Sequence, residues 1–123
     1  MTLNTHETLS GLGFVHAGAM RPIDGGQRCG VNIQDVRGFV IYAHVVGDQI
    51  KKFGITTPSL RSRVAQNVST INQVIALAEG RAASDARWHH RPFDAFKRLA
   101  PLIIRGNQAI DVWALQSTDA EYR

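Results

Sequence analysis

Three side chains suited to acid–base chemistry and to binding an oxyanion lie in the middle of this sequence of 123 residues: Tyr42, Lys52 and Arg63. A phenol and an amine both have unperturbed pKa values of ~10, so each can transfer protons when neighbouring groups lower its pKa. A planar guanidinium can bind two oxygens of one oxyanion, which an ammonium does less well. These three side chains can act on one substrate only if the secondary-structure elements that carry them bring them close together.

A β-hairpin is the clearest predicted element around these residues. Residues 39–46 are β-branched and aromatic, which predicts a strand. Gly47-Asp48 suits a tight type II′ turn, because glycine tolerates a positive φ at its first central position. Residues 49–55 then return as a second strand.

A helix is predicted directly after the hairpin. Thr56-Thr57-Pro58 offers a threonine cap and a proline at the first helical position. Apolar side chains then recur at three- and four-residue spacing, which indicates one apolar face, and a break near Ser69-Thr70 would divide the region in two. The residues of this face are Leu60, Val64, Asn67/Val68, Ile71 and Val74/Ile75.

These elements bring the reactive side chains to one place. Tyr42 and His44 share a face of the first strand, because side chains alternate along a strand. Lys52 and Thr56 share a face of the second strand for the same reason. Arg63 lies about two turns into the helix and can reach back over the sheet.

The rest of the pattern completes a small α+β domain. Residues 1–12 predict a short helix or a loose arm, residues 27–33 a weak strand, and residues 92–99 a helix that Pro101 ends or kinks. Residues 109–115 alternate as a third strand does. We expect a small antiparallel sheet of three or more strands packed with helices. The expected single domain, 1–123, comprises an N-terminal arm or extension (1–37), a core (38–115) and the start of a C-terminal helix or tail (116–123).

Composition and charge indicate where in the cell the protein is found and what kind of molecule it binds. Hydrophobic residues make up 44% of the chain and charged residues 20%, which is ordinary for a globular protein. No apolar run approaches the ~18 residues of a membrane span, the N-terminus lacks the features of a signal peptide, and Cys29 is the one cysteine. We therefore expect a cytoplasmic protein. Residues 51–105 carry ten basic side chains against three acidic ones, which favours a polyanionic partner such as nucleic acid.

Four pieces of the hairpin and helix follow one another in a recognisable order. Ile41-Tyr42 lies on the first strand, Lys52-Phe53-Gly54 on the second, Thr56 two residues later, and Arg63 in the helix. This order resembles the GIY-YIG nuclease superfamily, above all its small bacterial and phage-type members. There, a Gly-Ile-Tyr strand pairs with a Tyr-Ile-Gly strand, and a serine or threonine and a helical arginine follow. Lysine replaces the second tyrosine here, and Gly38 stands three residues before Ile41.

The resemblance implies a DNA endonuclease that hydrolyses phosphodiester bonds with a divalent metal, Mg²⁺ or Mn²⁺. Tyr42 and Lys52 would transfer protons, and Arg63 would stabilise charge on the phosphate. The family holds its metal with one glutamate from a later helix, which makes Glu121 the predicted ligand and Glu79 a weaker candidate. The predicted DNA contacts are His44, Lys51, Thr56, Arg61, Arg87, Trp88 and Arg91.

Two other interpretations stay open. A DNA-binding module of the same fold would keep the basic surface but would not cut, for want of the metal glutamate. An interaction domain that uses the edge of the hairpin would show no salt-dependent binding to nucleic acid.

Overall fold

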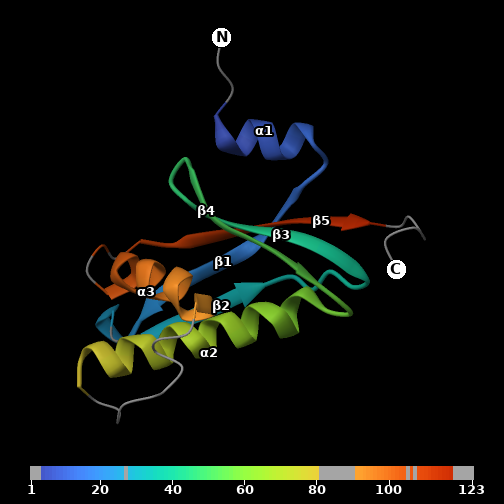
Figure 1. Ribbon diagram of the computed structural model, residues 1–123. Coiled ribbons are helices and arrows are strands. Elements are labelled where there is room, and N and C mark those ends of the chain that lie inside the picture. Colours follow the sequence, from blue (N-terminus) through green and yellow to red (C-terminus); the bar gives the residue numbers. More distant parts are fainter. Residues whose placement is uncertain (1–3, 27, 81–90, 105, 107, 118–123) are drawn as a thin grey trace.

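A computed structural model describes residues 4–26, 28–80, 91–104, 106 and 108–117 (Figure 1). As predicted, the fold is α+β, and the described residues form one antiparallel sheet packed with helices. The strands are β1 (Val15–Ile23), β2 (Arg28–Ile33), β3 (Phe39–Val46), β4 (Gln49–Thr56) and β5 (Ile110–Ser117). The helices are α1 (Thr5–Gly11), α2 (Leu60–Ala78) and α3 (Arg91–Ile104), and a short 3-10 turn, η1 (Asp24–Gly26), joins β1 to β2.

The sheet has the strand order β2-β1-β5-β3-β4, and neighbouring strands are antiparallel. The predicted hairpin is confirmed, since β3 pairs with β4 around a turn in which Gly47 has a φ of +59°. The predicted third strand is also confirmed, and β5 lies in the centre of the sheet between β1 and β3. Helix α1 anchors the hairpin turn, because the Thr5 amide donates to Asp48 Oδ1 at 2.7 Å.

Residues 15–33, expected to lie in an N-terminal arm or extension, contribute two strands to the same sheet. The weak strand predicted over residues 27–33 corresponds to β2. Close approach of β1 to β2 depends on Gly18, where a Cβ atom would lie 2.2 Å from the carbonyl oxygen of Asn32. Glycine and alanine are weak strand signals, which is why the sequence pattern missed β1.

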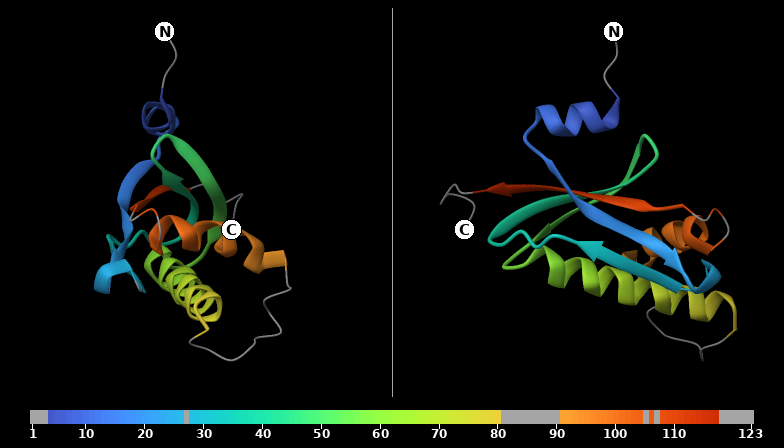
Figure 2. Two further views of the ribbon diagram at one scale, coloured as in Figure 1. Left: turned by 90° about the vertical axis from the view of Figure 1, so that its left-hand side faces the viewer. Right: turned by 180° about the vertical axis from the view of Figure 1, so that it is seen from behind.

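The helices divide between the two faces of the sheet (Figure 2). Helices α2 and α3 cover one face and bury the main hydrophobic core against it. Helix α1 covers part of the opposite face through Leu9, which packs with Phe14, Ala43 and Val45. The largest fully buried side chains of the main core include Met20, Val40, Leu60, Val64, Ile71, Val74, Ile75, Leu99, Ile103 and Ile110.

Helix α2 begins later than the Thr56-Thr57-Pro58 pattern predicts. Its N-cap is Ser59, whose hydroxyl oxygen accepts a hydrogen bond from the Ser62 amide at 3.2 Å. The carboxylate of Asp35 completes the cap, accepting from the Arg61 amide at 3.0 Å and from the Ser59 hydroxyl at 2.8 Å. These two hydrogen bonds lower the pKa of Asp35. The predicted threonine cap before Pro58 is therefore wrong, because a distant carboxylate favours Ser59 as the cap, and Thr56 ends strand β4.

Helix α2 continues where the sequence predicts a break, and helix α3 does not end at Pro101. Helix α2 is continuous through Ser69 and Thr70, and the Thr70 hydroxyl donates to the Gln66 carbonyl within the helix. Helix α3 continues past Pro101, because Leu99, Ala100 and Ile103 bury apolar surface on both sides of it. No helix within the described ranges is long and apolar enough to cross a membrane.

Candidate active site

Tyr42 lies on the face of β3 that α2 covers, and only 3% of its surface is exposed. Gly54 is its partner across the hairpin. A Cβ atom at Gly54 would lie 2.2 Å from Tyr42 Cζ and 2.3 Å from the hydroxyl oxygen, so the phenol rests directly on the glycine backbone. The glycine in the Lys52-Phe53-Gly54 motif is therefore required by the position of the tyrosine ring.

His44 extends this buried cluster along the same face of β3. It is fully buried, and its ring centroid lies 5.2 Å from that of Tyr42. The Asn67 side-chain amide on α2 joins the two rings: its nitrogen lies 3.1 Å from His44 Nε2 and donates to the Tyr42 hydroxyl at 3.4 Å. Burial, and secondarily the charge of Lys52, lower the pKa of His44 to about 4. The imidazole is therefore neutral at pH 7, and its burial places it inside the site rather than at the predicted contact with DNA.

Lys52 faces His44 across the hairpin, and its side chain is half-buried. Its ammonium lies 5.8 Å from the centroid of the Phe96 ring on α3, a separation typical of cation–π contact. The pairing shifts between His44–Lys52 and Val45–Ile50, so Lys51 is an extra residue in a β-bulge. A bulge redirects side chains locally, and Lys51 also faces α3, where it lines a pocket.

Arg63 reaches back to the hairpin from the first turns of α2, as the sequence predicts. Its Nε donates to the Thr56 hydroxyl at 3.4 Å, so Thr56, which is buried, positions the guanidinium rather than facing outward. Arg61 extends in another direction, and one of its terminal nitrogens donates to the Ile33 carbonyl on β2 at 3.4 Å. Of these two arginines, only Arg63 belongs with Tyr42, His44, Lys52 and Asn67, and we call these five residues the hairpin cluster.

Carboxylates are scarce around the hairpin cluster. Among the residues that the structure describes, no group of three or more His, Cys, Asp or Glu side chains is arranged to hold a metal ion. Glu79 caps the far end of α2, twelve residues beyond Asn67, which is ~18 Å along a helix. Glu121 lies outside the described residues. The described side chains therefore do not by themselves fit a divalent metal.

Three predicted DNA contacts cannot be placed by their side chains. Arg87 and Trp88 lie outside the described residues, and of Arg91 only the backbone, at the start of α3, is described. Asn67 is a further member of the site that was not predicted from the sequence. Its signal was present, because Asn67 is a polar residue on the otherwise apolar face of α2 and is 6% exposed. A buried amide requires hydrogen-bonding partners, and here they are Tyr42 and His44.

The sequence matches no family model and no curated protein, but two solved structures have a similar fold. A mutant of EndoII from bacteriophage T4 is 17% identical, with a TM-score of 0.63 over 98% of this chain and 81% of that chain. The restriction endonuclease HPY188I, solved in complex with product DNA, is 15% identical, with a TM-score of 0.58 over 94% of this chain. The present chain spans 62% of the length of HPY188I. Its fold is therefore one that these nucleases share.

Proposed function

We propose that this protein is a DNA endonuclease of the GIY-YIG type, which hydrolyses phosphodiester bonds with the help of a divalent cation, Mg²⁺ or Mn²⁺. The observation that carries the proposal is the hairpin cluster, in which a phenol, an amine and a guanidinium lie along the side of the β3–β4 hairpin that faces the helices. The similarity in fold to EndoII and to HPY188I, which was solved with product DNA, supports it.

The cluster has an outer cationic side and an inner proton-transfer side. Arg63 is exposed and Lys52 is half-buried, whereas Tyr42 is 3% exposed, so an approaching phosphate meets the two cations first. Because Arg63 uses Nε to hold Thr56, its two terminal nitrogens can bind two phosphate oxygens. Tyr42 then acts as the general base at the inner side: as a phenolate it takes a proton from the attacking water and becomes a neutral phenol, and the hydrogen bond from Asn67 stabilises the phenolate before that transfer.

The proposed metal ligand is Glu121, which lies outside the described residues. A bound divalent cation would stabilise the charge that develops on the leaving oxygen.

A plasmid-nicking assay tests the proposal. We expect the protein to nick supercoiled DNA with Mg²⁺ or Mn²⁺ and to stop when EDTA is added. Arg63→Ala should lower the nicking rate by ~10²–10³-fold, because it removes a group that stabilises charge in the transition state. Arg28→Ala is the matched control, because it removes one arginine from β2, at the opposite edge of the sheet. Equal rates for both variants would refute the proposed site.

A second function is a DNA-binding module that does not cut. The exposed Arg63 and the half-buried Lys52 favour it, because they can bind a phosphate backbone whether or not a metal ligand is present. This function predicts salt-dependent DNA binding and no nicking with either Mg²⁺ or Mn²⁺. Arg63→Ala would then weaken DNA binding, and there would be no nicking rate for it to change.

A further inference from the structure

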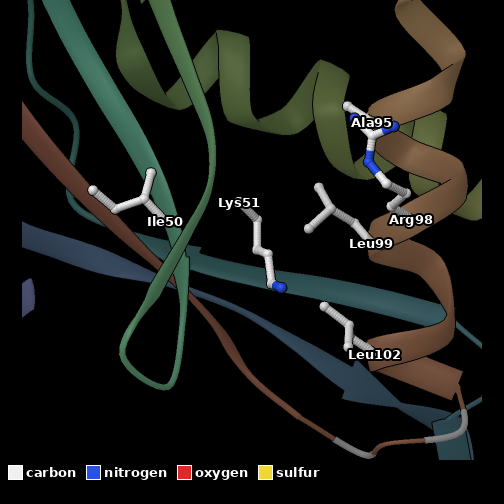
Figure 3. A pocket seen from close by; sticks show the side chains of 6 residues that line it. All are labelled: Ile50, Lys51, Ala95, Arg98, Leu99 and Leu102. Carbon is white, nitrogen blue, oxygen red and sulfur yellow. The ribbon is translucent and has the colours of Figure 1, made fainter.

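A small pocket lies between β4 and α3 (Figure 3). One of its lining residues, Lys51, is the chain neighbour of Lys52 in the hairpin cluster. The volume of the pocket is about 220 Å³. This is below the ~300–1,000 Å³ typical of pockets for whole cofactors or drug-sized ligands, so a single small group fits it best. The lining residues are Ile50 and Lys51 from β4 and Ala95, Arg98, Leu99 and Leu102 from α3.

The lining combines two cations with an apolar surface. Lys51 comes from the β4 wall and Arg98 from the α3 wall, and both side chains are exposed. Lys51 Nζ donates to the Gln49 side chain at 2.7 Å, a neutral partner that leaves its charge uncompensated. None of the six described lining residues is acidic, and neither cation forms an ion pair with a described residue. Such a pocket attracts an anion, and Leu99 and Leu102 offer an apolar surface beside it.

The β-bulge links this pocket to the hairpin cluster. Because Lys51 is the extra residue in the bulge, it faces α3 next to Lys52, whose ammonium lies over Phe96 of the same helix. A DNA strand bound at the hairpin cluster would therefore have a further cationic position beside Lys52.

We propose that this pocket binds one further backbone phosphate of the same DNA strand, between Lys51 and Arg98, with the attached deoxyribose against Leu102. The inference rests on the proposed function, because it presumes that the hairpin cluster binds DNA. It adds Arg98 to the predicted contacts and assigns Lys51 and Arg98 to a single phosphate rather than to separate ones.

The test measures binding of a short fluorescent DNA duplex by anisotropy, in EDTA so that cleavage does not interfere, over a range of salt concentrations. The variants are Lys51→Gln, Arg98→Gln, the double variant, and Arg28→Gln as a control for charge alone. We expect each pocket variant to weaken binding several-fold and the double variant to weaken it by clearly less than the product of the two single effects, because both cations share one phosphate. The slope of log affinity against log salt should fall by ~1 in the double variant, the loss of one phosphate contact.

Each other outcome overturns the inference. Losses that multiply in the double variant would show two independent contacts, and unchanged binding in the pocket variants would show none. An equal loss in Arg28→Gln would show only a general effect of charge. These three results leave the proposed function standing, provided that the unmodified protein binds with a steep salt dependence. If the unmodified protein does not bind DNA at low salt, the proposed function fails and the inference fails with it.

Discussion

Acid should destabilise this protein through His44. Burial and the nearby Lys52 lower the pKa of His44 to about 4 in the folded protein, whereas an unfolded histidine has a pKa of ~6.5. The unfolded chain therefore binds the proton more tightly, so stability is complete above pH ~6.5 and is lost as the pH falls toward 4. For a single site with these two pKa values, the free energy of unfolding should drop by about 2 kcal/mol between pH 8 and pH 5.

Urea denaturation at pH 8 and pH 5, followed by circular dichroism, measures this drop. His44→Gln removes the titrating group, so its free energy of unfolding should change by about 2 kcal/mol less than that of the unmodified protein between the two pH values. The comparison uses the change with pH, and a lower stability of the variant at both pH values does not affect it. His6→Gln is the control, since His6 lies on α1 outside the hairpin cluster. If His44→Gln and the unmodified protein lose the same free energy, His44 does not titrate as a buried group and the description of the cluster is wrong.

Two further predictions concern Tyr42 and the glycine beneath it. Tyr42→Phe should lower the nicking rate by at least ~100-fold with little change in DNA affinity, because the hydroxyl acts in the proton-transfer step and the cations bind the phosphate; an unchanged rate in the plasmid assay would remove Tyr42 from the mechanism. Gly54→Ala should cost about 1–3 kcal/mol in urea denaturation, because the new Cβ would overlap a buried ring. Gly11→Ala, where a Cβ meets nothing within 4 Å, should cost much less, and a similar cost at both positions would contradict the close contact of Gly54 with Tyr42.

The sequence predicted the β3–β4 hairpin and β5 well because their signals are local. Residues 39–46 are β-branched and aromatic, and Gly47 allows the positive φ of the turn, so both strands follow from short-range chemistry. The face of Tyr42 and the reach of Arg63 then follow from the strand and helix periods alone. The part of the site that depends on periodicity could therefore be predicted.

The remaining parts depend on contacts between residues far apart in the sequence. The cap of α2 moves to Ser59 because Asp35, 24 residues earlier, binds both its hydroxyl and the following turn. The bulge at Lys51 appears only in the pairing of the two strands, since one extra residue leaves no mark in an alternating pattern. Asn67 looked like one position of an apolar face because its partners, Tyr42 and His44, lie on β3.

The lysine that replaces the second tyrosine of the motif is consistent with the neutral histidine beside it. Lys52 lies opposite His44 in the hairpin, and its charge adds to burial in disfavouring a proton on the imidazole. A neutral His44 can accept a hydrogen bond from Asn67, and the same amide also donates to the Tyr42 hydroxyl. Protonation of His44 would abolish that acceptor and place a second cation beside Lys52. Lys52, which we propose binds phosphate, thus also helps to preserve the hydrogen bonds around Tyr42, the proposed base.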